Sequence, residues 1–268
     1  MIRQLFVVAL ALLILPASIW ADITAHIAWY RGGSTLTNSG STYQEANIET
    51  AFDALGVSHG YTWAEVDTAQ DVINGALVNL DGTSKYAVVY FMGGSGTAYN
   101  SGLGVDGKAA IQAFVDAGGG YVGSCAGAFY GSDNYTDLWA GDANPDASIL
   151  RVDYVLDTGH ALNSGMGEVL EDVQFYGGCW LEEGVANTDY VAEYDTTDTG
   201  LNGHPSMTFS YYGDGPVLLS GGHPEEGLGV GDLDYFKQMF IYVVGLGAYE
   251  DTPIPTVSGC TITGGQTQ

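Results

Sequence analysis

Basic residues are scarce in this 268-residue chain, which has six Lys and Arg against 32 Asp and Glu. The formal net charge is −26 at pH 7, so nucleic acid and anionic membrane surfaces would repel the protein and are not expected as partners. The acidic residues are scattered along the chain and form no long run. That pattern favours a heavily solvated acidic surface over the alternative, a site for cations or cationic substrates.

Calcium-loop spacing of acidic residues and internal repeats are both absent from the sequence. We therefore predict no metal site and no cofactor. The apolar fraction of 46% is ordinary for a globular protein. The length and this composition predict one large α/β domain over residues 22–250, with a flexible tail at 251–268.

The N-terminal segment MIRQLFVVALALLILPASIWADI has the pattern of a signal peptide over residues 1–21. Arg3 supplies a short positive region, Leu5–Leu15 is unbroken and apolar, and Ala21 suits the position before cleavage. The apolar run is short for a transmembrane helix. We expect a secreted or periplasmic protein with no stable membrane insertion after cleavage, and an uncleaved anchor is the alternative.

Cysteine is also rare, with Cys125, Cys179 and Cys260 only. An odd count in an exported protein indicates one free thiol or an intermolecular bond. If Cys125 is the free thiol, Cys179 and Cys260 remain as a pair that could form a disulfide.

Alternating apolar strands and amphipathic helices predict a mostly parallel sheet with helices on both faces. The first half of this pattern comprises a strand at Ile23–Tyr30, a helix at Gln44–Leu55 ended by Gly56, a helix at Ala69–Val78, a strand at Tyr86–Met92, a helix at Gly107–Ala117 and a strand at Tyr121–Ser124. Beyond Tyr135 we expect added antiparallel strands at Ile149–Leu156, Val169–Tyr176, Tyr190–Tyr194, Met207–Tyr212 and Val217–Ser220, then a closing helix at Asp234–Leu246.

Cys125 lies in a G-x-C-x-G segment, GSCAG, between a predicted strand and a predicted helix. This is the thiol form of a nucleophile elbow, in which small neighbours allow a tight turn that exposes the sulfur. The start of the following helix stabilises negative charge and offers backbone N–H groups to an oxyanion.

A nucleophilic cysteine requires a base, and His223 is the best placed of five histidines. It follows the apolar strand Val217–Ser220, and Glu225 two residues on could orient its imidazole. The alternative is an ordinary turn histidine. Gly93 and Gly94 follow another strand, and their N–H groups could complete an oxyanion hole with that of Ala126, although an ordinary turn is again the alternative. The other histidines, which lie in a strand or in loops without such a context, are His26, His59, His160 and His204.

The order of these motifs resembles the class I glutamine amidotransferase-like superfamily, and within it the N-terminal domain of biotin–protein ligases and free-standing relatives. The resemblance covers most of Ile23–Glu225 and rests on the segments MGGSGTAY, GGYVGSCAGAFYGS, FYGGCW, VAEY and GPVLLSGGHPE. It implies a flavodoxin-like α/β fold with Cys125 as nucleophile, His223 as base and Glu225 as orienting acid. It also implies that Gly93 and Gly94 form the oxyanion loop and that a pocket is lined by Tyr99, Phe129 and Trp180.

The chain departs from this family in ways that bear on function. No biotin-ligase catalytic domain follows, so ligation is not expected, and an exported protein has no obvious synthase to receive ammonia. Met92 and Cys179 stand where relatives often carry proline.

The expected activity is that of an exported thiol hydrolase acting on a small-molecule or peptide amide, for instance a γ-glutamyl or peptide bond. Two alternatives remain: a non-catalytic ligand-binding or assembly domain that retains the fold, and thiol-based redox chemistry at the elbow.

Overall fold

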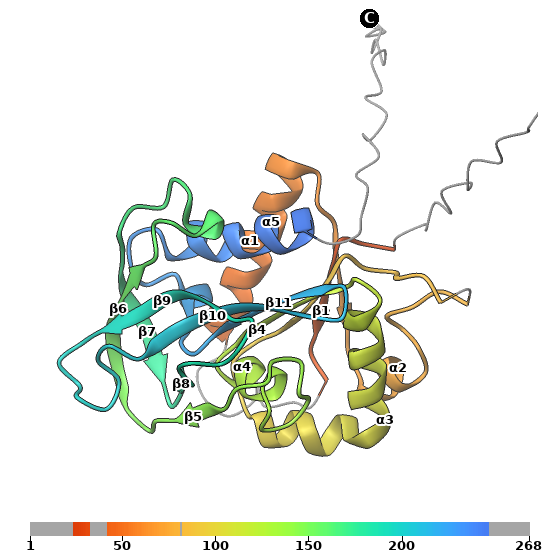
Figure 1. Cartoon of the computed structure of the whole chain (residues 1–268). Helices are drawn as coiled ribbons and strands as arrows, with labels where there is room; N and C mark the ends of the chain where they lie inside the picture. Colours follow the sequence, from red (N-terminus) through yellow and green to blue (C-terminus); the bar gives the residue numbers. More distant parts are fainter. Residues whose placement is uncertain (1–23, 33–41, 81, 247–268) are drawn as a thin grey trace, which may run out of the picture.

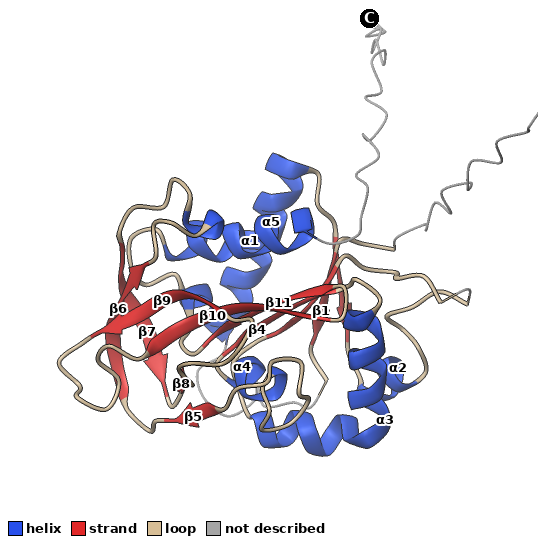
Figure 2. Cartoon of the chain, in the orientation of Figure 1, coloured by secondary structure: helices blue, strands red, loops and turns tan. Residues whose placement is uncertain are grey.

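The computed structural model of the chain describes residues 24–32, 42–80 and 82–246. The predicted signal peptide at 1–21, the predicted tail at 251–268 and Cys260 lie outside the described residues. The described strands form a nine-stranded mixed sheet and a small two-stranded sheet, and helices cover both faces of the large sheet (Figures 1 and 2). This is the α/β architecture that the sequence pattern predicts.

The elements follow one another along the chain with short connections. The strands are β1 (Ile27–Tyr30), β2 (Trp63–Val66), β3 (Val88–Phe91), β4 (Gly120–Ser124), β5 (Ala143–Pro145), β6 (Ile149–Leu156), β7 (Val169–Tyr176), β8 (Cys179–Leu181), β9 (Asp189–Asp195), β10 (Pro205–Tyr212) and β11 (Gly215–Ser220). The helices are α1 (Thr42–His59), α2 (Ala69–Ile73), α3 (Gly96–Asp116), α4 (Ala126–Gly131) and α5 (Asp232–Leu246), with 3-10 turns η2 (Ala161–Asn163) and η3 (Pro224–Glu226).

The large sheet has the strand order β2-β1-β3-β4-β11-β10-β9-β6-β7. Neighbouring strands are parallel from β2 to β11 and antiparallel from β11 to β7. Strands β3, β4 and β11 are therefore adjacent and parallel, so their carboxyl ends meet at one edge of the sheet. That edge is where α/β folds of this kind place their sites.

Two hydrophobic cores lie on the two faces of the sheet. Helices α1 and α5 cover one face, and α2, α3 and α4 cover the other (Figure 1). Alternate residues of a strand serve opposite cores: Trp29 and Tyr90 belong to the first core, whereas Tyr30 and Phe91 belong to the second. Burial on both faces explains why these strands are apolar throughout.

The structure corrects three predicted helix boundaries. Helix α1 continues through Gly56 to His59, so the prediction that Gly56 ends it is wrong; Gly60 has a positive φ of 71° and follows the helix. Helix α2 ends at Ile73, well before the predicted Val78, because the chain turns at Gly75, where φ is 84°.

The third correction concerns α3, which begins at Gly96 where the sequence pattern predicts Gly107. The side chain of Ser95 caps it by accepting a hydrogen bond from the Ala98 N–H at 3.2 Å. Gly104 is non-helical, with φ 57° and ψ −160°, and divides the segment into two helical pieces. Three glycines and several small polar residues made the first piece resemble a loop.

Candidate active site

Three predicted motifs meet where β3, β4 and β11 end. Cys125 directly follows β4, Gly93 comes two residues after β3, and His223 comes three residues after β11. The strand order, which the sequence pattern did not specify, makes these strands neighbours. The fold therefore brings together residues that lie far apart in the chain.

Cys125 lies on a strained turn between β4 and α4. Its φ of 48° and ψ of −103° are unusual for a residue with a Cβ. Its N–H donates to the Ser220 carbonyl at 2.8 Å, and its carbonyl accepts the Phe129 N–H at 3.0 Å. Such a conformation persists only where the surroundings hold it, and it is common at functional sites.

The glycines on either side of Cys125 are required by close backbone packing. A Cβ at Gly123 would lie 2.5 Å from the Gly127 carbonyl oxygen, and a Cβ at Gly127 would overlap the Phe91 carbonyl. The G-x-C-x-G spacing therefore allows the start of α4 to pack directly against the ends of β3 and β4.

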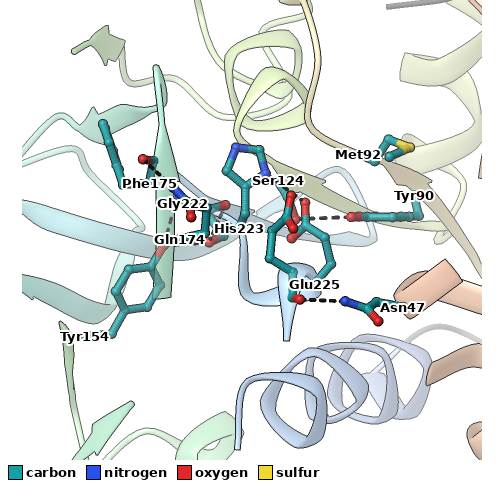
Figure 3. A network of polar contacts seen from close by, with 12 residues as sticks. Asn47, Tyr90, Met92, Ser124, Tyr154, Gln174, Phe175, Gly222, His223 and Glu225 are labelled. Atoms are coloured by element: carbon teal, nitrogen blue, oxygen red, sulfur yellow. Dashed lines mark hydrogen bonds and ion pairs between the residues drawn. The ribbon is translucent and has the colours of Figure 1, made fainter. Parts of the chain in front are cut away.

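His223 and Glu225 form a buried pair beside this turn. His223 Nδ1 lies 3.1 Å from Glu225 Oε1, and the residues are 5% and 0% exposed. The His223 N–H donates to the Gln174 carbonyl of β7 at 2.9 Å, which fixes the backbone that carries the ring (Figure 3). With Nδ1 directed at the carboxylate, Nε2 is the nitrogen left to exchange a proton with a thiol.

The imidazole also interacts directly with the Cys125 thiol. Burial lowers the pKa of His223, but the charge and hydrogen bond of Cys125, followed by those of Glu225, raise that pKa well above the usual value for histidine. These interactions favour the protonated form of the His223 ring. His223 thus interacts with both of the other residues predicted to form a triad, Cys125 and Glu225.

The predicted oxyanion loop lies next to the elbow. A Cβ at Gly96, two residues after Gly94, would be 3.4 Å from the Ala126 carbonyl oxygen. Within the part of the chain that the structure describes, no hydrogen bond is donated by the backbone N–H of Gly94 or Ala126. Both groups could therefore serve a developing oxyanion.

The three residues predicted to line a pocket occupy different settings. Tyr99 is buried, and its hydroxyl donates to the Met92 carbonyl at 3.0 Å, which supports the chain just before Gly93. Phe129 is partly buried beside α3. Trp180 is partly buried in β8, and its ring stacks on His204 with centroids 4.3 Å apart. Their contact with a substrate remains a prediction.

Cys179 lies near the site, although its position in a Gly-Gly-Cys segment gave no sign of this beyond the family resemblance. Its N–H donates to the Gly221 carbonyl at 3.2 Å, next to the Ser220 carbonyl that Cys125 uses. Burial and the nearby Cys125 raise the pKa of the Cys179 thiol well above its usual value. Cys125 and Cys179 are both free thiols.

Buried polar residues that sequence reasoning missed support the turn before His223. The Tyr154 hydroxyl accepts the Gly222 N–H at 2.9 Å and lies 3.1 Å from Ser220 Oγ (Figure 3). No local sequence signal marks Tyr154, because it comes from β6, three strands away from β11 in the sheet.

The described residues contain neither a candidate metal site nor a candidate membrane-spanning helix. No group of three or more His, Cys, Asp or Glu side chains there could hold a metal ion. No described helix is both long enough and apolar enough to span a bilayer.

Comparison with known proteins supports the expected resemblance. Residues 35–144 match the family model described as "Biotin-protein ligase, N terminal". The match includes Gly93, Gly94 and Cys125 and ends before His223 and Glu225. No curated protein matches the chain.

Solved structures with the same fold cover most of this chain. A ThuA-like protein from Bacteroides uniformis is 14% identical, with a TM-score of 0.56 over 84% of this chain and 94% of its own. A protein described as a GMP synthase component, from Thermoplasma acidophilum, is 12% identical, with a TM-score of 0.53 over 82% and 94%. A chain of PurLQS from Thermotoga maritima is 14% identical, with a TM-score of 0.55 over 81% and 99%. The chain therefore has the class I glutamine amidotransferase-like fold, as the sequence predicts.

Proposed function

We propose that this protein is an exported thiol hydrolase that cleaves a C–N amide bond through Cys125, His223 and Glu225. The observation that carries the proposal is the interaction of His223 with both Cys125 and Glu225 at the carboxyl ends of adjacent parallel strands. The amidotransferase-like fold is compatible with such chemistry and does not by itself establish it.

The proposed reaction begins with attack of the Cys125 sulfur on the amide carbonyl carbon. The carbonyl electron pair moves to oxygen, and the N–H groups of Gly94 and Ala126 stabilise the oxyanion. The His223 imidazolium donates its proton to the amide nitrogen, the C–N bond breaks and the amine leaves. His223 then takes a proton from water, whose oxygen attacks the thioester, and the C–S bond breaks to release the acid.

Substitution of Cys125 by serine tests the proposal directly. Purified protein is screened against γ-glutamyl and peptide amides, with release of the amine as the readout. Cys125→Ser is expected to lose about a thousandfold or more in rate. The serine hydroxyl is a far weaker acid than the thiol, so the same histidine activates it much less well as a nucleophile. Equal turnover by both proteins would exclude Cys125 as the nucleophile.

Cys179→Ser is the matched control, because it makes the same atomic change at a second buried thiol near the site. Cys179 has no part in the proposed reaction, so its variant should keep wild-type turnover. The alternative, a non-catalytic binding domain, predicts that no amide is cleaved and that both variants bind ligand like the wild type.

A further inference from the structure

One short piece of backbone at the end of β11 connects the two reacting groups of the proposed mechanism. The carbonyl of Ser220 accepts the Cys125 N–H at 2.8 Å, and His223 follows three residues later. Only Gly221 and Gly222, which we call the glycine link, join these two points. The conformation of the glycine link therefore decides how far the imidazole lies from the thiol.

The glycine link has no side chains with which to hold itself in place. Side chains are excluded there, because a Cβ at Gly221 would overlap the Cys179 carbonyl oxygen and a Cβ at Gly222 would lie 2.5 Å from the Tyr154 hydroxyl. Hydrogen bonds to neighbouring elements hold it instead. The Gly221 N–H donates to the Ser206 carbonyl at 2.8 Å, and the Gly221 carbonyl accepts the Cys179 N–H at 3.2 Å.

The N–H of Gly222 is different, because its acceptor is a side chain. It donates to the Tyr154 hydroxyl at 2.9 Å (Figure 3). That hydroxyl lies 3.1 Å from Ser220 Oγ, and Ser220 Oγ donates to the Gly222 carbonyl at 3.4 Å. With the serine proton directed at this carbonyl, the tyrosine proton goes to Ser220 Oγ, and every proton in the set has one acceptor. The three hydrogen bonds form a closed ring that ties the residues on either side of Gly221 to Tyr154.

Tyr154 can fix the glycine link because its own position is fixed. The residue is 0% exposed in β6, and its ring packs edge-on against Tyr194 with centroids 5.4 Å apart. The Tyr194 hydroxyl donates to the Cys179 carbonyl at 2.6 Å. Another buried tyrosine, Tyr90, donates to Ser124 Oγ at 3.4 Å beside the nucleophile (Figure 3). That contact holds a side chain, whereas Tyr154 holds the backbone that carries the base.

We propose that Tyr154 is a positioning residue, whose hydroxyl fixes the glycine link and thereby holds the His223 imidazole within reach of Cys125. The inference rests on the proposed function, but it concerns a residue that acts through the backbone of Gly222. The alternative is that the backbone hydrogen bonds of Gly221 and His223 are enough to hold the turn. In that case the hydroxyl of Tyr154 would contribute to the core and not to the site.

Tyr154→Phe tests the proposal, because it removes the hydroxyl and keeps the ring. The first readout is hydrogen exchange of the Gly222 amide by NMR, which should become about tenfold faster once the acceptor is lost. The second is titration of the His223 ring by NMR, with the resonance assigned by its loss in His223→Gln. Against the lowering effect of burial, contacts with Cys125 and Glu225 raise the pKa of His223 well above its usual value. A loosened link should let that pKa fall towards the usual value.

Alkylation of Cys125 connects the position of the base to the reactivity of the thiol. Purified protein is treated with iodoacetamide at neutral pH, and the Cys125 peptide is followed by mass spectrometry. The rate should fall about tenfold in Tyr154→Phe, as in His223→Gln, because a slightly displaced base activates the thiol poorly. A rate that falls in His223→Gln but not in Tyr154→Phe would contradict the positioning role. An unchanged rate in His223→Gln would count against the proposed function, and exchange and titration would still decide the role of Tyr154.

Tyr235→Phe is the matched control. It also removes the hydroxyl of a fully buried tyrosine in the same core, and with it one hydrogen bond, to Asn163 Oδ1 at 2.7 Å. Exchange of the Gly222 amide and titration of His223 should remain those of the wild type in this variant. Equal effects of the control and of Tyr154→Phe would show a general loosening of the core and would contradict the proposal.

Unchanged exchange and titration in Tyr154→Phe would overturn the inference, whatever the turnover of Cys125→Ser shows. Should this variant fail to fold, hydrogen exchange in the wild type still decides the question. The Gly222 amide should be as protected as the amides of Gly221 and His223, whose acceptors are backbone carbonyls. A Gly222 amide that exchanges much faster than both of its neighbours would show that the tyrosine hydroxyl does not hold the link.

Discussion

Cys125 shows how a local motif can point to a candidate site residue. The small neighbours, the preceding apolar strand and the later HPE segment are all local in sequence, and they are sufficient to pick out Cys125, His223 and Glu225, which the fold brings together. Tyr90 and Tyr154 could not be found in the same way. Both tyrosines lie within largely apolar strands, where an aromatic residue is expected to belong to the core. Their hydroxyls reach the site only because of the strand order.

At the residue scale, Gly127→Ala should destabilise the protein severely. The new methyl group would overlap the Phe91 carbonyl. Neither group can move aside, because the methyl carbon is attached directly to the backbone and the carbonyl is part of it. We expect a loss of about 3 kcal/mol or more in the free energy of unfolding, measured by urea denaturation.

Gly245→Ala is the opposite case within the same chain. Gly245 lies in α5, and a Cβ added there would have nothing within 4 Å. Alanine there should stabilise the helix, by up to about 1 kcal/mol. Similar destabilisation by both substitutions would show that backbone packing at the elbow is not what selects glycine at 127.

At the scale of elements, the length and burial of a strand or helix decide whether it can be predicted from the sequence. The predicted ranges of β6 and β7 match the structure, because alternation over eight residues with one buried face is a clear signal. Strands β2, β5 and β8 have three or four residues each and are partly exposed, so they give no such signal. Helix α1 shows that an interior glycine is a poor marker of a helix end when another glycine follows.

The junction between η3 and α5 should respond to pH through Asp232. This buried side chain accepts the N–H groups of Leu228 and Gly229 at 3.1 and 2.7 Å. Burial raises its pKa to about 6, against the smaller lowering effects of these hydrogen bonds and of Arg151. Because this folded-state pKa is above that of the unfolded chain, its contribution to stability is complete below about pH 4 and is lost as pH rises through about 6.

Urea unfolding midpoints measured between pH 4 and 7 test this expectation. Asp232→Asn should remove the part of the decline in stability that belongs to this group. Asp106→Asn, which removes an equal charge from an exposed position on α3, should leave the decline unchanged. An identical decline in Asp232→Asn and the wild type would show that the junction does not sense pH in this range.

At the scale of the whole molecule, the net charge is −26. Repulsion among the acidic side chains is therefore an important unfavourable contribution to the free energy of folding. Three of the described cations are already paired with acids: Arg31 with Glu45 and Glu65, Lys108 with Asp137, and Lys237 with Asp234. Salt should therefore stabilise the fold by screening the remaining acids. We expect the unfolding temperature to rise by about 5 °C between 10 mM and 0.5 M NaCl.

MgCl₂ and CaCl₂ at matched ionic strength distinguish screening from specific binding of cations. Screening alone predicts similar stabilisation by all three salts once ionic strength is equal. Strong stabilisation by millimolar calcium or magnesium would instead favour a cation site, against the interpretation of the acidic surface as a solvated one.

The position of β11 between the parallel and antiparallel halves of the sheet has a consequence for folding. Strand β11 pairs with β4 on one side and with its hairpin partner β10 on the other, so the base reaches the thiol only after a segment of about 100 residues has been closed into the sheet. During synthesis, β4 and the elbow emerge long before His223 does. The cysteine is thus separated from its proposed base until His223 has been synthesised, which would keep its reactivity low in the partly made protein.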